Sequence, residues 1–314
     1  MSRLTNPNRV NIMSRHLQLF IMPLIAVMGA VMSIVLVPYG AQGATIFEDA
    51  IVYYDFEETG QAVLDQSTTT AINLQLGSTG GVDANDPART AGKSGSGLGF
   101  TLANGDIATS DSDQNALDFD GGDPFTVAGW FRRPDNAVTL SQLVTKMDTP
   151  GSYPGWLFNW RGSSTSANAN GIELLLRDNA GGASDGLLAV RSEAVVTTDW
   201  VHLAATYDGS ATVGGIQLYA DGQLLGLGSD ANNTQDVSFE TTSVTNNNAP
   251  FNIGGRNNIG NFDGFADDVA VWDRVLTQSE ILEAMAIVPE PSGIALVGLA
   301  ILSVALRRRR IESI

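Results

Sequence analysis

The chain of 314 residues contains no cysteine and only two histidines. The absence of cysteine excludes a disulfide framework, a Cys-ligated zinc site and thiol catalysis. Two histidines leave little room for a His-based metal site or for general-base catalysis, and only His202 lies beyond the N-terminal region. The 34 glycines include no Walker or dinucleotide-binding fingerprint. The chemistry of thiols, disulfides and bound nucleotides is therefore not expected.

Basic residues are scarce and unevenly placed. The formal net charge is −17, from 34 Asp and Glu against 17 Lys and Arg, and Lys93 and Lys146 are the only lysines. Residues 45–286 hold ten basic and 32 acidic residues. Such an acidic domain disfavours nucleic-acid binding, which needs a basic face. The two ends are basic and apolar, as targeting segments are.

The N-terminal region, residues 1–43, has the pattern of a secretory signal peptide. Arginines precede an apolar run from Leu17 to Pro38. Ala41 and Gly43 place small residues at the −3 and −1 positions of a cleavage site after Gly43. An uncleaved anchor helix is the alternative, because the apolar run is long for a signal core. Either alternative implies that the acidic domain is exported.

The C-terminal region, residues 287–314, combines three features in a fixed order. Pro289, Glu290 and Pro291 come first, and the apolar run Gly293–Leu306 follows. The region then continues with four arginines, Arg307, Arg308, Arg309 and Arg310. As a helix the apolar run would rise about 21 Å, which is short of the roughly 30 Å hydrocarbon core of a bilayer. The arginines would stay on the cytoplasmic side of the membrane.

This three-part order resembles the PEP-CTERM sorting signal of Gram-negative bacteria. The resemblance implies export, transient membrane anchoring, and recognition by an exosortase-type sorting protease that cleaves near the Pro-Glu-Pro tripeptide. It further implies that the protein ends at the cell surface or in the extracellular matrix, where such proteins often accompany exopolysaccharide. A plain tail anchor is the alternative.

Residues 45–286 consist of short apolar or alternating runs between Gly, Asn, Asp and Ser clusters, which predicts an all-β domain. Strands are expected at residues 51–56, 71–76, 125–132, 142–146, 156–160, 172–177, 187–191, 200–207, 216–220, 251–253 and 265–272. Asp221 and Gly222 predict a two-residue hairpin. Thr277 and Glu280 form a capping box that begins one short helix. So many short strands favour a sandwich of two antiparallel sheets.

Several blocks of this region resemble the LamG-like jelly-roll domain of the concanavalin A-like superfamily. In family order they are Tyr53–Glu57, Phe125–Phe131, Trp200–Gly209, Leu218–Gly222, Asn252–Gly255 and Phe262–Trp272. The resemblance covers roughly residues 50–286 and implies two curved antiparallel sheets with neighbouring first and last strands. It also implies a binding role more often than catalysis, and the ligands of the superfamily include glycans, proteins and calcium.

Calcium is the one cofactor that the resemblance suggests, as a structural ion. Ca²⁺ takes six to eight oxygen ligands. By resemblance the candidates are Asp65, in an early loop, and the pair Asp267 and Asp268 near the last strand. The alternative is that these carboxylates accept hydrogen bonds from loop amides, with Asp65 in an Asx turn.

A second acidic run, from Asp111 to Asp123, begins like an EF-hand calcium loop. It lacks the glycine that such a loop needs at its sixth position and the glutamate at its twelfth, where Ala116 and Gly122 stand. We therefore expect a solvated loop before the strand at residue 125.

Glycan binding uses exposed aromatic rings with polar groups around them. Tyr153, Trp156 and Trp160 are candidates, because Pro- and Gly-rich sequence surrounds them. The alternative is that they pack in the core or in a hairpin. His202 alternates with Trp200 and favours a packing or hydrogen-bonding role.

The residues argue against catalysis. Glycoside hydrolases on this fold often carry Glu-x-Asp-x-x-Glu on one strand, and the sequence contains no such spacing. One histidine in the domain does not support a Ser-His-Asp set. We predict an exported, non-enzymatic module that binds a polysaccharide or a surface protein. The alternatives are a structural matrix component without a discrete ligand and a carbohydrate-active enzyme.

Overall fold

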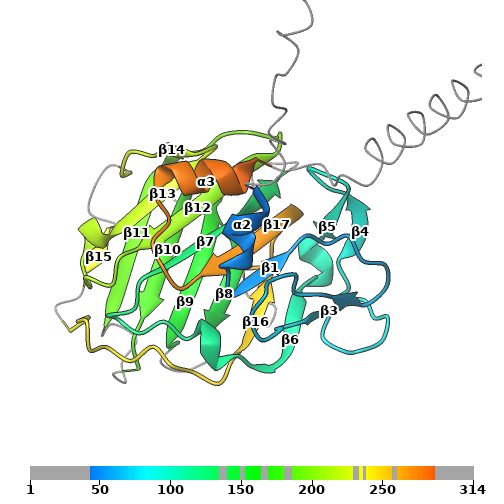
Figure 1. Ribbon diagram of the computed structural model, residues 1–314, viewed down its shortest axis with the longest axis horizontal. Helices are drawn as coiled ribbons and strands as arrows, with labels where there is room; N and C mark the ends of the chain where they lie inside the picture. Colours follow the sequence, from blue (N-terminus) through cyan, green and yellow to red (C-terminus); the bar gives the residue numbers. More distant parts are fainter. Residues whose placement is uncertain are drawn as a thin grey trace, which may run out of the picture. The chain divides into compact units, whose positions relative to one another are not determined.

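Two antiparallel β-sheets pack face to face in the computed structural model (Figure 1). The structure describes residues 43–133, 140–148, 153–163, 169–179, 186–228, 233–235, 238–256 and 260–286. All of these residues belong to one compact unit, which lies within Gly40–Ile314. Residues 1–42 of the predicted signal peptide and the whole predicted sorting signal lie outside the described residues. Within the described ranges, no helix is long and apolar enough to cross a membrane.

Sheet A contains eight strands in the described part of the chain, in the order β14-β13-β12-β7-β17-β5-β4, with β1 also paired to β17. The bounds are β1 Val52–Tyr54, β4 Ala88–Ala91, β5 Ser96–Phe100, β7 Phe125–Arg132, β12 Val201–Tyr207, β13 Ile216–Ala220, β14 Gln223–Leu224 and β17 Gly264–Trp272. Strand β17 pairs with β7 on one side and with β5 and β1 on the other. The expectation that the first and last strands are neighbours is confirmed.

Sheet B contains nine strands among the described residues, in the order β15-β11-β10-β9-β8-β16-β6-β3-β2. The bounds are β2 Ala62–Val63, β3 Leu74–Leu76, β6 Ala108–Asp113, β8 Leu140–Met147, β9 Gly155–Arg161, β10 Gly171–Arg177, β11 Leu187–Ala194, β15 Thr234–Gln235 and β16 Pro250–Ile253. Strands β8 to β11 form consecutive antiparallel pairs, and this part of the sheet carries the candidate site described below.

The main core lies between the two sheets. Because successive side chains of a strand point to opposite faces, every second residue of β7 and β9 enters this core. Phe125 of β7 stacks on Phe119 with ring centroids 4.4 Å apart and contacts Trp156 of β9 at 5.2 Å. Large buried rings of this kind supply most of the apolar area that holds a sandwich together.

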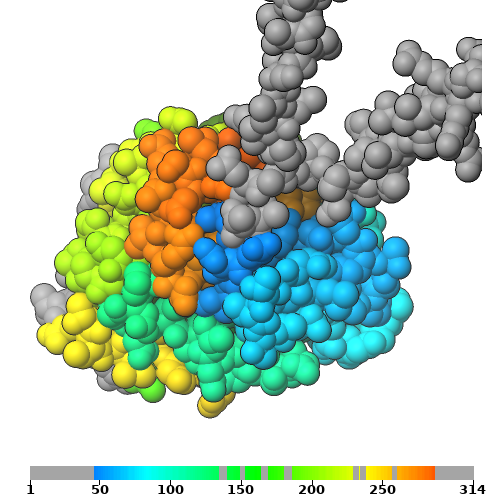
Figure 2. Space-filling view, viewed as in Figure 1, coloured from blue at the N-terminus to red at the C-terminus, as the bar shows by residue number. Residues whose placement is uncertain are grey.

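A second, smaller core covers the outer face of sheet A, the face that points away from sheet B. Helices α2 (Gly43–Glu48) and α3 (Gln278–Met285) lie side by side there (Figures 1 and 2). Ile281 of α3 and Trp272 of β17 belong to this core, and the Trp272 indole N–H donates to the Ile46 carbonyl at 2.8 Å. The predicted capping box of α3 is present, with the Thr277 side chain accepting from the Glu280 amide.

All eleven expected strands are present, with boundaries shifted by a few residues. The predicted hairpin also forms, since Asp221 and Gly222 join β13 to β14 with positive φ angles of 46° and 71°. Strand β5 was not predicted, because its two glycines interrupt the alternation of apolar and polar residues that indicates a strand. Strand β6 was not predicted either, and it corrects the expected solvated loop, since Asp111 and Asp113 belong to this strand.

Candidate functional site

A row of polar side chains crosses the outer face of sheet B, the face that points away from sheet A. Gln142 of β8 stands opposite Asn159 of β9, Asn159 opposite Glu173 of β10, and Glu173 opposite Arg191 of β11. The alternation that turns Trp160 into the core turns Asn159 outward. Neighbouring strands lie about 4.8 Å apart, so these four residues extend over about 14 Å. We call Gln142, Asn159, Glu173 and Arg191 the polar row.

Glu173 is the electrostatic centre of the polar row. Only 2% of its surface is exposed. Its carboxylate accepts hydrogen bonds from Arg191 Nε at 2.6 Å, from Asn159 Nδ2 at 2.9 Å and from Arg161 Nη1 at 3.2 Å. A buried carboxylate needs partners of this kind because the charge has lost most of its water. Glu173 therefore holds two guanidinium groups and one amide in fixed positions on this face.

Other polar atoms on this face have no hydrogen-bond partner. Gln142 Oε1, Asn159 Oδ1 and Thr145 Oγ1 are all buried and unpartnered. An unsatisfied buried polar atom costs on the order of 1–3 kcal/mol, and few such atoms occur in native proteins. Hydroxyl groups of a ligand, or water, would complete them. These three unpartnered atoms lie on adjacent strands, so this face has the capacity to form hydrogen bonds with a polar molecule.

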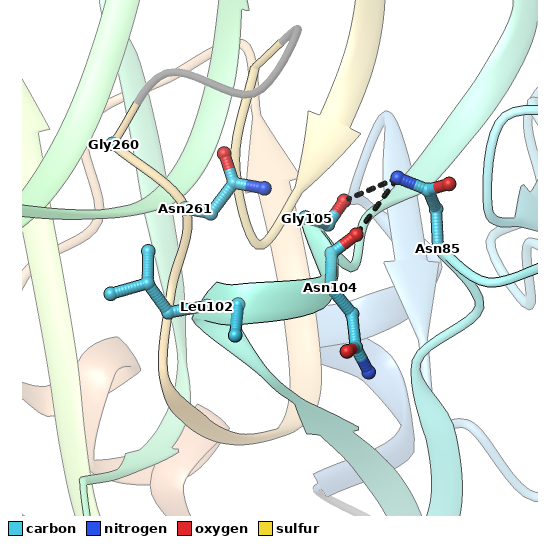
Figure 3. A pocket seen from close by; sticks show the side chains of 7 residues that line it. Asn85, Leu102, Asn104, Gly105, Gly260 and Asn261 are labelled. Carbon is cyan, nitrogen blue, oxygen red and sulfur yellow. Dashed lines mark hydrogen bonds between the residues drawn. The ribbon is translucent and has the colours of Figure 1, made fainter.

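A cavity of about 300 Å³ adjoins the polar row (Figure 3). Its lining residues are Asn85, Leu102, Ala103, Asn104, Gly105, Gly260 and Asn261. Gly260 connects the cavity to the row, because its carbonyl accepts from the Gln142 amide at 2.7 Å. A side chain at position 260 would clash, because a Cβ atom there would lie 2.9 Å from Gln142 Cγ. The backbone φ of Gly260, 63°, also favours glycine.

Asn261 lines the cavity with an unpartnered side-chain amide. It is 2% exposed, and neither its Oδ1 nor its Nδ2 has a hydrogen-bond partner. Figure 3 shows its amide nitrogen directed towards Gly105. On the other wall, Asn85 Nδ2 donates to the carbonyls of Asn104 at 3.0 Å and Gly105 at 3.4 Å. One wall of the cavity is thus held by hydrogen bonds, and the other carries the unpartnered amide of Asn261. The cavity volume lies at the lower end of the usual range of ligand sites, roughly 300 to 1,000 Å³.

Two of the three aromatic residues predicted to bind a glycan lie in the core. Trp156 and Trp160 are 0% exposed. Their indole N–H groups are already used, since Trp156 donates to the Leu117 carbonyl at 2.8 Å and Trp160 to the Asn170 carbonyl at 3.2 Å. The prediction that they form exposed platforms is therefore wrong, because their side of β9 faces sheet A. Tyr153 is only half-buried and lies just before β9.

Asp65 accepts hydrogen bonds from its own loop. Its Oδ1 accepts from the amides of Tyr53 at 3.0 Å and Ser67 at 2.9 Å, and its Oδ2 accepts from the Ile72 amide at 3.0 Å. The bond to the amide two residues ahead is that of an Asx turn. Both oxygens of this candidate calcium ligand are thus engaged by the backbone.

Asp267 and Asp268 lie at a bulge in β17. Asp267 Oδ2 accepts from the amides of Lys93 at 2.7 Å and Ser94 at 3.0 Å, while Asp268 Oδ1 accepts from the Tyr53 hydroxyl at 2.6 Å. Burial raises the pKa of Asp268 to about 6. Burial, and then the charge of Asp268, raise the pKa of Asp267 to about 8.

The predicted calcium ligands do not converge. Asp65 accepts a hydrogen bond from the backbone amide of Tyr53, whereas Asp268 accepts one from the hydroxyl at the far end of the Tyr53 side chain. In the part of the chain that the structure describes, no group of three or more His, Cys, Asp or Glu could hold a metal ion. Calcium at these residues remains a prediction that the arrangement of the carboxylates does not support.

His202 packs against Trp130 on the outer face of sheet A. The two rings meet edge to face with centroids 5.4 Å apart, and His202 is 2% exposed. Burial lowers the pKa of His202 to about 3, so the imidazole is neutral at physiological pH. The expected packing role agrees with this position.

The polar row and the cavity were not predicted from the sequence. The one local signal was a charged or amide residue inside an otherwise apolar strand, as Glu173 lies between Ile172 and Leu174 and Asn159 between Phe158 and Trp160. That signal marks each residue alone, and only the register of the strands brings the residues into one row.

Comparisons with known proteins agree with this fold. The family model described as "Concanavalin A-like lectin/glucanases superfamily" matches residues 102–282, more than half of the chain. No curated protein matches the sequence.

Three solved structures illustrate the likeness. The binding domain of Paraclostridial Mosquitocidal Protein 1 has a TM-score of 0.51 and 15% identity, over 76% of this chain and 52% of that one. The Botulinum Neurotoxin serotype G binding domain has a TM-score of 0.50 and 12% identity, over 74% and 50%. Domain 4 of AbnA, a GH43 extracellular arabinanase from Geobacillus stearothermophilus solved with arabinotriose, has a TM-score of 0.50 and 15% identity, over 75% and 98%. The match spans about half the length of the two toxin domains, and at these identities it shows a shared fold.

Proposed function

The chain belongs to the concanavalin A-like lectin/glucanases superfamily, and from this premise we propose that it is a non-catalytic module that binds a glycan. The binding site is the polar row on sheet B together with the adjoining cavity. The observation that carries the proposal is the set of buried, unpartnered groups of Gln142, Asn159 and Asn261 along this one surface. Side-chain amides suit sugar hydroxyls because each offers both a donor and an acceptor.

A non-catalytic role fits the chemistry of the same face. Glycoside hydrolysis uses two carboxyl groups, roughly 5 to 10 Å apart, one of which must exchange a proton with the substrate. Glu173 is the one carboxylate in the polar row, and two arginines and an amide already engage its oxygens. Such a carboxylate orients its neighbours and is poorly suited to act as a general acid.

We also propose that the two terminal segments are targeting signals. Residues 1–43 would export the protein, and residues 287–314 would act as a PEP-CTERM signal for an exosortase-type protease. The support is the order of Pro289 to Pro291, the apolar run and Arg307 to Arg310. The protein would then reside at the surface or in the matrix of a Gram-negative-type bacterium. Mass spectrometry of mature material tests this, and an intact C-terminal arginine cluster would contradict sorting by cleavage.

The glycan proposal is tested by measuring saturable binding on a polysaccharide array and then by calorimetry. Arabinotriose is a natural first probe, since a protein of this fold was solved with it. Asn159→Ala and Asn261→Ala should each weaken binding about five- to tenfold, as expected for one lost hydrogen bond. Asn115→Ala, at an exposed asparagine outside the site, is the matched control.

The alternatives predict other results. A structural matrix component gives no saturable binding to any probe at high protein concentration. A carbohydrate-active enzyme releases new reducing ends from soluble polysaccharides during a long incubation. Equal loss of binding in Asn159→Ala and Asn115→Ala would place the site elsewhere on the domain.

A further inference from the structure

Arginine gathers on one face of this acidic domain. Of the ten basic residues in residues 45–286, Arg161, Arg177 and Arg191 stand at outward positions of β9, β10 and β11. Arg256 follows β16 in the same sheet. At the outward positions of β8 to β11 in the described chain, the carboxylates are Glu173 and Glu193. Arginines thus outnumber carboxylates on this part of sheet B, in a domain that is strongly negative as a whole.

The four arginines differ in their partners. Arg161 and Arg191 are both paired with Glu173, at 3.2 and 2.6 Å. Arg177 and Arg256 form no ion pair with any carboxylate of the described residues. The carboxylate of Asp148 acts on Arg256 only from beyond ion-pair distance, although the domain holds 32 acidic residues.

Arg177 and Arg256 share one aromatic ring. Their Cζ atoms lie 5.8 and 5.4 Å from the centroid of the Tyr153 ring, within the range in which a cation is attracted to the π face. Arg256 is only 6% exposed, and its Nη1 donates to the Asp148 carbonyl at 3.0 Å. The Nε atoms of both arginines are buried and unpartnered. Tyr153 and Arg177 are half-buried, so the group is accessible from one side.

Two effects disfavour the charged form of Arg256 at this position. Burial lowers the pKa of Arg256 and the positive charge of Arg177 contributes in the same direction, whereas Tyr153 and Asp148 act in the opposite direction. Two guanidinium groups that share a ring repel each other more strongly where water is partly excluded. Each guanidinium presents parallel N–H donors that match the two oxygens of a carboxylate or a sulfate. An oxyanion would satisfy both the charges and the free donors.

We propose that Arg177, Arg256 and Tyr153 form a subsite for an oxyanion carried by a polysaccharide, either a uronate carboxylate or a sulfate ester. This inference rests on the proposed glycan-binding function and specifies its ligand class as acidic. Arg177 lies four residues beyond Glu173 on β10, about 13 Å along the strand. The subsite therefore receives a different sugar unit from the one at the polar row, and the ring of Tyr153 offers it an apolar face.

The experiment compares acidic polymers with their neutral counterparts on the intact protein. Polygalacturonate and its carboxyl-reduced form test the carboxylate, while dextran sulfate and dextran test the sulfate. Binding is measured by calorimetry at low salt. We expect one acidic polymer to bind at least tenfold more tightly than its neutral counterpart, and the pair that shows this difference identifies the oxyanion.

Variants tie this preference to the subsite. Arg177→Gln should lower the acidic-to-neutral ratio of affinities to about one while leaving the weaker binding of the neutral polymer unchanged. Arg256→Gln should do the same, but Arg256 is buried, so Arg177→Gln decides the result if that variant fails to fold. Arg132→Gln is the matched control, because Arg132 packs on Phe265 of sheet A, with its Cζ 4.2 Å from the ring centroid.

The possible failures are distinguishable. Equal binding of acidic and neutral polymers would overturn the oxyanion subsite and leave the glycan-binding proposal intact. No saturable binding of any polymer would overturn both. An equal loss in Arg132→Gln and Arg177→Gln would show that overall charge governs the affinity, which also overturns the subsite.

Discussion

Lys146 offers the sharpest test of how the domain is held together. It is 0% exposed, and its Nζ lies 2.8 Å from both Asp113 Oδ1 and Asp118 Oδ1. The carbonyl and side-chain oxygens of Asn247 complete its surroundings at 3.3 and 3.1 Å. Lys146 thus joins β8, which carries Gln142 of the polar row, to the end of β6 at Asp113 and to the loop that contains Asp118. Lys146→Met keeps the length of the side chain and removes the charge.

The magnitude follows from what the substitution leaves behind. Asp118 is nearly buried, and burial raises its pKa even with Lys146 present. Removing one partner of a buried ion pair costs about 3–5 kcal/mol, because the remaining charge has no compensation. Replacing all three charges, with Asp113→Asn and Asp118→Asn added to Lys146→Met, should recover at least half of that loss, since no uncompensated charge then remains.

The assay is urea unfolding followed by tryptophan fluorescence, with the free energy of unfolding extrapolated to water. Lys93→Met is the matched control, because Lys93 is the other lysine of the chain and is exposed. Its Nζ lies 4.4 Å from the Trp130 ring centroid, a contact worth about 0.5–1 kcal/mol at an exposed site. If Lys146→Met and Lys93→Met destabilise the domain equally, the buried ion pair does not stabilise it as argued.

Three further predictions concern buried titratable groups. His202 has a folded pKa of about 3, below its unfolded value of about 6.5, so its contribution to stability is present above about pH 6.5 and is lost as the pH falls. His202→Gln should reduce the slope of unfolding free energy between pH 6 and 4 by about 1.4 kcal/mol per pH unit, and an unchanged slope in urea titrations would contradict the assignment. Asp268 has a folded pKa of about 6, above the unfolded value of 3.8, so its contribution is present at low pH and is lost as the pH rises through about 6. Asp268→Asn can still accept from Tyr53 and suits the φ of 48°, so it should stabilise the domain at pH 7 by up to about 3 kcal/mol, whereas a loss of stability would show that the carboxylate is needed. Glu173→Gln removes the charge that two arginines share and should lower the free energy of unfolding by about 3 kcal/mol, with Glu193→Gln, at an exposed glutamate, as control. Equal stability of the two glutamate variants would mean that the ion pairs of the polar row contribute nothing.

The strands were predictable where their own residues carry the signal. In Phe125–Arg132, aromatic and β-branched residues favour an extended chain whatever surrounds it. The hairpin at Asp221 and the cap at Thr277 depend only on residues within a few positions. Strand β5, residues 96–100, carries no such signal, because pairing with β17 and β4 supplies what its glycines lack.

The site was less predictable for a physical reason. Alternation shows that Trp156, Phe158 and Trp160 share one face of β9, but not which face is the core. Proline and glycine near the tryptophans suggested an exposed turn, whereas the structure places that side against sheet A. Once the aromatic side is buried, Asn159 and its neighbours must face outward.

The sequence by itself determined the all-β character, the acidic charge, most strand positions and the capped helix. These properties depend on residues close together in the chain, or on composition alone. Only the tertiary structure decided that Gln142, Asn159, Glu173 and Arg191 form a row, and that Arg177 and Arg256 share Tyr153. Those contacts depend on the register between strands and on loops brought together from distant parts of the chain, which no local pattern encodes.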